Sequence, residues 1–217
     1  MSRIWLATLA VRGSPPESAE RTAVPGVATG LAVTGLGGDV LYIEAGSPGS
    51  EGGVGESALI LTGQLGDVMK ESAQIALSYV RSHAEELGVD PPAALNRKIH
   101  VHVPAGAVPK DGPSAGVTMV TALVSMATGR QVRSDVGMTG EVTLNGRVLP
   151  IGGVKQKLLA AQRAGLSTVF IPQRNEADLD DVPAEVLEAL TVKPMTDVAD
   201  IVAQALEPAT EAATAAA

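Results

Sequence analysis

The stretch Pro109-Lys110-Asp111-Gly112-Pro113-Ser114-Ala115-Gly116 places one serine between helix-breaking residues and an apolar segment that runs from Val117 to Ala127. A hydroxyl at this position has two possible roles. It can cap the N-terminus of the following helix, or it can act as a nucleophile there. The residues after it are apolar around almost the whole helical circumference, which predicts a buried helix that ends at Gly129.

The composition limits the classes of function. The chain has 217 residues, 45% of them hydrophobic, which is enough for one core. Its net charge is −8 and its Lys and Arg residues are scattered, so direct binding to nucleic acid is not expected. The absence of cysteine excludes disulfides, thiolate nucleophiles and Cys-type zinc sites, and fits a reducing compartment. No apolar run approaches the length of a membrane span.

Both ends of the chain differ from the middle. Residues 1–22 are predicted to be a linker or a vector-derived segment, with a weak signal-peptide pattern at residues 4–11 as the alternative. Residues 207–217 are rich in Ala and Thr and predict a disordered tail. One domain is therefore expected over residues 23–206.

Periodicity in this domain predicts interleaved strands and helices. The dipeptide Asn145-Gly146 predicts a hairpin turn. Because no simple βαβ repeat emerges, the expected fold class is α+β with mixed sheets and packed helices. The expected strands cover residues 28–34, 40–44, 58–62, 98–103, 136–144, 148–151, 168–171 and 191–193; the expected helices cover residues 65–87, 114–129, 153–165, 184–189 and 197–206.

A second candidate for chemistry is Lys157. On a helical wheel it shares a stripe with Val154, Leu158 and Ala161, whereas Lys155 points to the other side. The ordinary alternative is a lysine stem that lies along apolar surface with its ammonium in water. If the amine is desolvated, its pKa falls toward about 7 to 8 and it becomes a usable general base. A serine and a neutral lysine suffice for acyl transfer without a histidine.

The histidines offer two further alternatives. His100 and His102 share one face of a predicted strand and could chelate a metal, but no third ligand is evident, so structural roles are favoured. A Ser-His-Asp triad that uses His102 is a minor alternative, because its acid and geometry are unspecified.

Several stretches, in order, closely resemble the proteolytic domain of the Lon family, ATP-dependent serine proteases of the Ser-Lys dyad type. The resemblance covers residues 25–206 and implies a fold related to domain 2 of ribosomal protein S5. Three stretches carry most of it: KDGPSAG (residues 110–116), MTGEVTL (138–144) and LPIGGVKQK (149–157). Two more extend it: TGQLGDVMKES (62–72) and IHVHVP (99–104).

The resemblance implies roles for individual residues. Ser114 becomes the nucleophile, Lys157 the general base, and Thr139 a residue that orients the lysine amine. The loop of Asp111, Gly112 and Pro113 adopts open and closed forms in Lon-like domains. Asp111 is therefore either a contact of Lys157 in an inactive state or an exposed loop carboxylate.

The chain also departs from the family. A full Lon enzyme carries an AAA+ ATPase module, but no Gly-x-x-x-x-Gly-Lys-Ser/Thr phosphate loop occurs here. ATP and Mg²⁺ would be used by that absent module, so no cofactor is expected in this chain. The resemblance implies unfolded polypeptide substrates, a homo-hexameric ring and a cytoplasmic location.

Two other functions remain as alternatives. Small-molecule kinases of the same broad fold bind phosphate with a Gly/Ser-rich loop at a helix N-terminus, and residues 112–116 could mimic that loop. The longer Gly-Leu-Gly-Ser-Ser run of those kinases is absent. The second alternative is a catalytically silent assembly module.

Overall fold

A computed structural model of the chain describes residues 17–48, 58–90, 95–104 and 108–209. The signal-peptide alternative at residues 4–11 and the tail beyond residue 209 lie outside these ranges. The helices are α1 (Glu17–Arg21), α2 (Asp67–Ser82), α3 (Gly116–Thr128), α4 (Val154–Arg163), α5 (Ala184–Ala189) and α6 (Val198–Ala205), with the 3-10 helices η2 (Pro113–Ala115) and η3 (Gln173–Asp181). The strands are β1 (Val27–Thr34), β2 (Gly37–Gly46), β3 (Leu59–Thr62), β4 (Ile99–His102), β5 (Val136–Met138), β6 (Glu141–Val142), β7 (Val148–Leu149), β8 (Thr168–Pro172) and β9 (Thr191–Met195).

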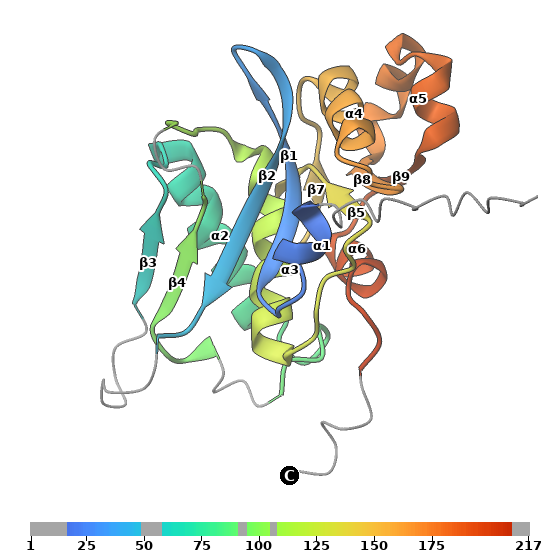
Figure 1. Ribbon diagram of the computed structural model, residues 1–217. Helices are drawn as coiled ribbons and strands as arrows, with labels where there is room; N and C mark the ends of the chain where they lie inside the picture. The colour runs from blue at the N-terminus through green and yellow to red at the C-terminus, as the bar shows by residue number, and fades with distance from the viewer. Residues whose placement is uncertain (1–16, 49–57, 91–94, 105–107, 210–217) are drawn as a thin grey trace, which may run out of the picture.

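Seven strands form one mixed sheet in the order β3-β4-β2-β1-β5-β8-β9, and β6 and β7 form a small antiparallel pair. β1 pairs antiparallel over its whole length with residues 37–44 of β2, and the hairpin that they form projects past the other strands of the sheet (Figure 1). The pairs β3·β4, β1·β5, β5·β8 and β8·β9 are parallel. The predicted mixed sheet with packed helices is confirmed.

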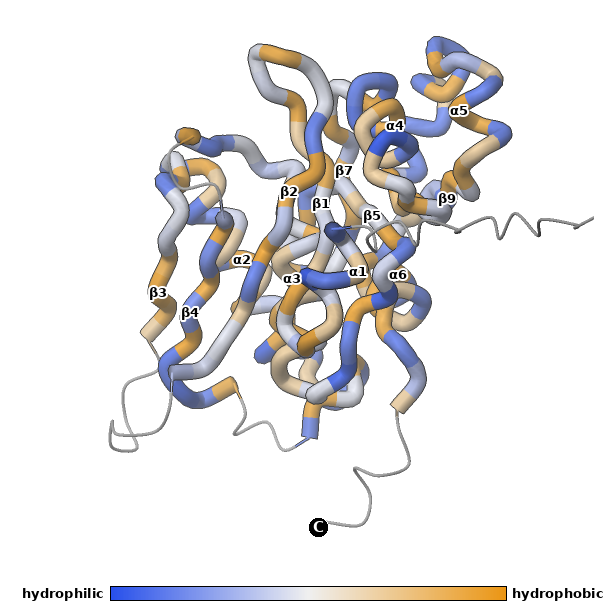
Figure 2. The backbone as a smooth tube through the Cα atoms, in the orientation of Figure 1, coloured by the Kyte–Doolittle hydropathy of each residue, from blue (hydrophilic) through white to orange (hydrophobic). Residues whose placement is uncertain are grey.

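The sheet separates two hydrophobic cores. Alternate residues of β8 point to opposite faces, so Phe170 joins one core whereas Val169 and Ile171 join the other. The first core packs α2, α3 and α6 against the sheet, and the second packs α4, α5 and η3 against the opposite face. Figure 2 shows apolar residues along the strands of the sheet and, interspersed with polar ones, along the helices.

The helix that follows Ser114 is buried as predicted. Every residue of α3 from Gly116 to Ser125 is buried, and the helix ends at Gly129 in the left-handed conformation, with φ of 68°. Gly116 allows the close approach of β6, because an added Cβ would lie 2.9 Å from the Val142 backbone nitrogen. This close approach brings the start of α3 beside the β5–β6 segment.

The structure corrects the predicted strand over residues 136–144. β5 ends at Met138, and the next two residues leave the main sheet before the short hairpin of β6 and β7 begins. The Thr139 N–H still donates to the Phe170 carbonyl of β8 at 3.0 Å, but the Gly140 N–H turns to the Ser114 carbonyl at 2.9 Å, and this contact with a distant segment takes the chain out of the sheet. The hairpin at Asn145-Gly146 is present but shorter than predicted.

Three other elements differ from the prediction. The long helix over residues 65–87 ends at Ser82 and is continued by turns to Gly88. η3 was not predicted, because its polar sequence has no clear periodicity. α1 lies inside the predicted linker, where Ser18 is buried and Arg21 pairs with Glu44 at 3.5 Å. The described part of the predicted linker is therefore folded against the sheet.

Candidate active site

Ser114 lies in η2, immediately before the buried helix α3. Gly112 precedes it with φ of 132°, a conformation that L side chains rarely adopt, and Pro113 starts the 3-10 turn. In the part of the chain that the structure describes, neither η2 nor α3 has a side-chain cap. The capping role for Ser114 is therefore wrong, and its partly buried hydroxyl is left for another use.

Lys157 lies on the inner face of α4, as the helical wheel predicts. Its side chain is only 3% exposed, whereas the neighbouring Lys155 is exposed. Its Nζ donates a hydrogen bond to Thr139 Oγ1 at 3.0 Å. Burial lowers the pKa of Lys157 from 10.5 to about 8, because the charged form loses its hydration. The alternative in which the stem lies along apolar surface and the ammonium reaches water is therefore wrong for this lysine.

Thr139 links the two candidate residues. It follows β5 and is fully buried. Its hydroxyl accepts from the Lys157 amine and donates to the Ser114 carbonyl oxygen at 3.4 Å. No direct bond from Lys157 Nζ to the Ser114 hydroxyl occurs within the described ranges. Catalytic hydrogen bonds are often long before substrate binds and tighten in the reacting complex.

Asp111 caps α2 instead of contacting Lys157. Its exposed carboxylate accepts from the Met69 N–H at 3.0 Å and from the Gly112 N–H at 2.9 Å. α2 has no side-chain cap of its own at Gly66, so the acceptor comes from the loop before Ser114. An added Cβ at Gly66 would lie 2.2 Å from Asp111 Cγ. The loop carboxylate is thus exposed, as one alternative expects, and it also ties the loop to α2.

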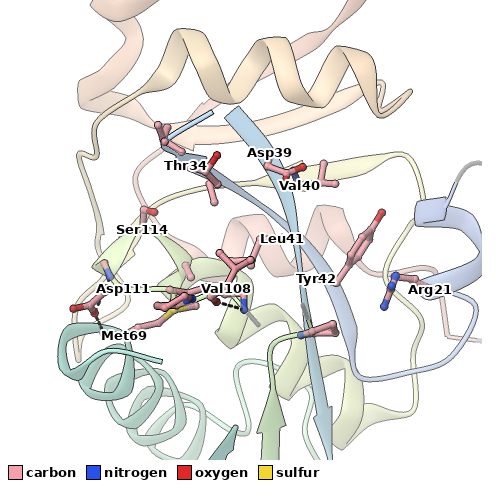
Figure 3. Close-up of a pocket in the computed structure, with 18 of the residues that line it drawn as sticks. Arg21, Thr34, Asp39, Val40, Leu41, Tyr42, Met69, Val108, Asp111 and Ser114 are labelled. Carbon is pink, nitrogen blue, oxygen red and sulfur yellow. Dashed lines mark hydrogen bonds between the residues drawn. The ribbon is translucent and has the colours of Figure 1, made fainter. Parts of the chain in front are cut away.

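A groove of about 570 Å³ leads away from Ser114 along β2. Figure 3 shows Ser114, Asp111 and Met69 toward one end and Tyr42 and Arg21 toward the other. Only residues 44–46 of β2 pair with β4, so the rest of this β2 edge has no strand partner among the described residues. Sequence analysis did not predict the groove, because it depends on where β2 and the loop before Ser114 meet.

His102 takes part in a separate cluster. The Thr62 hydroxyl lies 2.7 Å from His102 Nδ1 and 2.8 Å from His100 Nε2, which joins β3 to β4. His102 does not line the groove that holds Ser114, so the Ser-His-Asp alternative is not formed. In the described ranges no group of three His, Cys, Asp or Glu side chains could hold a metal ion.

Asn175 is a residue that sequence analysis missed. It is 5% exposed, and its side-chain amide accepts from the Ile151 N–H at 2.9 Å and donates to the Ile151 carbonyl at 2.8 Å. These two hydrogen bonds fix the segment between β7 and α4, and α4 carries Lys157. One asparagine in a polar stretch gives no sequence signal for such a contact.

A serine near a buried lysine of lowered pKa, with one threonine bonded to both, suits acyl transfer of the Ser-Lys type. Comparison with known proteins identifies the chain as part of a protease. The chain belongs to the family of the Lon protease (S16) C-terminal proteolytic domain, whose model matches residues 7–208.

Curated relatives extend the comparison. The chain is 85% identical over 202 residues to the Lon protease of Mycolicibacterium smegmatis, a match that covers 93% of this chain and 25% of the relative. It is 73% identical over 194 residues to the Lon protease of Salinispora arenicola (strain CNS-205), which covers 89% of this chain and 24% of that relative. The chain thus spans about a quarter of the length of these relatives. Within the described ranges, no helix is both long and apolar enough to cross a membrane.

Proposed function

We propose that this chain is the peptidase part of a Lon-type protease and hydrolyses peptide bonds, with Ser114 as nucleophile and Lys157 as general base. The observation that carries the proposal is the buried Lys157 amine, which is bonded to Thr139 beside the backbone of Ser114. Burial lowers the pKa of Lys157 to about 8, so a useful fraction of the amine is neutral near neutral pH.

The chemistry needs only these groups and water. Neutral Lys157 takes the proton of the Ser114 hydroxyl as Oγ attacks the carbonyl carbon of the scissile bond. The resulting ammonium gives the proton to the leaving amine nitrogen when the C–N bond breaks, which leaves an acyl-enzyme ester on Ser114. A water molecule then gives a proton to Lys157 as its oxygen attacks the ester carbonyl. When the ester C–O bond breaks, the Lys157 ammonium returns that proton to Ser114 Oγ, which releases the second product as an acid and restores the free hydroxyl and the neutral amine.

Thr139 has the geometry of a positioning residue. Its hydroxyl proton is engaged by the Ser114 carbonyl, so its oxygen faces the amine as an acceptor. One N–H of neutral Lys157 then points at Thr139, and the amine lone pair is left to receive the serine proton. Thr139 therefore sets the orientation of the base without taking part in proton transfer.

The groove supports an extended polypeptide as substrate. Its wall includes the β2 edge, whose backbone N–H and carbonyl groups can pair with an extended chain as another strand would. Leu41, Met69 and Val108 contribute apolar side chains to this wall. A folded protein cannot present a peptide bond to such a groove, so the proposed substrates are unfolded polypeptides.

The features of a complete Lon enzyme are part of the proposal. An ATPase module outside this sequence would use ATP and Mg²⁺ to unfold substrates, and the protease would act as a homo-hexamer in the cytoplasm. The relatives that are named Lon protease, each about four times longer than the match, support this view. The chain by itself is expected to cleave short or unfolded peptides slowly.

The test combines a fluorogenic peptide assay with labelling by a fluorophosphonate. Ser114→Ala should abolish both signals, and Lys157→Ala should reduce both by at least about 100-fold. Lys155→Ala, two residues away and exposed, is the matched control and should retain full activity. Peptidase activity that survives both dyad substitutions would contradict the mechanism. Nucleotide turnover without peptidase activity would favour the kinase-like alternative, and neither activity at any pH would favour the silent module.

A further inference from the structure

The tip of the β1–β2 hairpin exposes apolar surface beside the groove. Leu36 is fully exposed there, and Val33 is 49% exposed. Val33, Thr34 and Gly35 line the same groove as Ser114, and Val108 lines it as well. The exposed large apolar side chains in the described ranges are Val24, Val33, Leu36, Val68, Val108 and Leu144. Val33 and Val108 line the groove, and Leu36 directly follows the lining residue Gly35, so exposed apolar side chains of the hairpin tip lie at the groove or next to it.

Local hydrogen bonds fix the hairpin tip. The Thr34 hydroxyl donates to the Gly37 carbonyl at 3.2 Å and accepts from the Leu36 N–H at 3.2 Å. Gly37 has φ of 118°, which lets the chain reverse without strain. The turn therefore holds Leu36 outward in a preset position, so a partner that covers it gains the free energy of burying a leucine side chain without first ordering the turn. Figure 1 shows the hairpin projecting past the rest of the sheet, and Figure 2 shows its apolar tip.

We propose that the hairpin tip, residues 33–37, is an accessory docking site that binds an apolar segment of the polypeptide substrate several residues from the scissile bond. The proposal rests on the proposed peptidase function. The proposed occupant is the substrate because the groove is continuous with the hairpin: Thr34 and Gly35 line it together with Ser114, and Leu36 directly follows Gly35 in the chain. The hairpin adds binding energy for apolar segments without touching the reacting bond.

The test uses two internally quenched peptides with identical residues around the scissile bond. One carries a Leu- and Val-rich tail and the other a Ser- and Gly-rich tail. Each peptide is made in two versions, with the tail on the N-terminal or on the C-terminal side of the scissile bond. We expect wild-type protein to show a lower KM for the apolar tail. Leu36→Ser should raise that KM about fivefold, because a half-buried leucine contact is lost, and should leave kcat unchanged. The KM for the polar-tailed peptide should not change.

Leu144→Ser is the matched control, because Leu144 is also an exposed leucine near a hairpin turn but does not line the groove. It should leave every KM unchanged. Equal KM values for the two peptides in wild-type protein, or equal effects of Leu36→Ser on both, would overturn the docking site. So would a change in oligomeric state in Leu36→Ser with KM unchanged, which would make the tip a contact between copies. Fluorophosphonate labelling of Ser114 reports separately on the peptidase site, so its loss would reject the proposed function instead.

Discussion

Replacement of Lys157 by methionine tests the burial of the candidate base. Methionine has a similar length and no charge, so it removes the ammonium while it fills much of the same space. The side chain is 3% exposed, and the second core of Leu158, Val154 and Ala161 surrounds its helix face. A protonated amine in this position loses hydration that the unfolded chain retains. The substitution should therefore increase the free energy of unfolding near neutral pH.

The magnitude follows from the pKa shift. Burial lowers the pKa of Lys157 from 10.5 to about 8, which corresponds to about 3 kcal/mol of penalty for the charged form in the folded state. Between pH 8 and 10.5 the unfolded chain binds the proton and the folded chain does not, so wild-type stability rises with pH in this window. Below pH 8 the full penalty is present. Above pH 10.5 both states are neutral and it disappears.

The measurement is urea unfolding of wild-type and Lys157→Met protein from pH 6.5 to 10.5. The stability difference, variant minus wild type, should fall by about 3 kcal/mol across this range. The Met variant also leaves Thr139 without the amine, at a cost of about 1–3 kcal/mol, but this term does not depend on pH. Lys155→Met, on the exposed face, should give a flat difference. A flat difference for Lys157→Met as well would refute the buried, pKa-shifted base.

Three further predictions concern the same site. Peptidase kcat/KM should rise with pH to a plateau, with its midpoint near pH 8, because the neutral form of Lys157 is the base; a pH–rate profile measures this, and activity that falls through pH 8 would contradict it. Thr139→Val should lower kcat about 10- to 100-fold with little change in KM, since the amine loses its orientation, whereas Thr139→Ser should restore most of the rate. Gly66→Ala should push the Asp111 carboxylate off α2 and reduce stability by about 1 kcal/mol in thermal unfolding, whereas Gly46→Ala, where nothing lies within 4 Å of an added Cβ, should change little.

The sequence predicted features that depend on local pattern. The all-apolar segment after Ser114 predicts a buried helix, and α3 is one. The stripe that Lys157 shares with Val154 and Leu158 predicts its burial on α4, because helical periodicity fixes which residues face the sheet. Asn145-Gly146 predicts a hairpin turn, and β6 and β7 flank it.

Features that depend on contacts between distant segments were not predictable in this way. Asp111 has no local reason to cap a helix that begins at Asp67, and the contact exists only because the fold brings the two loops together. The strand predicted over residues 136–144 breaks after Met138 because Gly140 binds the Ser114 carbonyl, which no local pattern specifies. The role of Asn175 could not be predicted from the sequence either, because its two hydrogen bonds join it to Ile151, which lies 24 residues away in the chain.

The break after β5 explains how one sheet can position two groups that belong to different cores. Ser114 is held at the start of α3, which packs in the first core, whereas Lys157 is carried by α4, which packs in the second core on the opposite face. Side chains in the two cores do not contact each other through the sheet, so neither core alone can fix the distance between the serine and the lysine. The segment of Thr139 and Gly140 contacts both: the Gly140 N–H binds the Ser114 carbonyl, and the Thr139 hydroxyl binds the Lys157 amine. The alignment of nucleophile and base therefore depends on the two residues that follow the interior strand β5, and a longer, regular strand at this point would separate them.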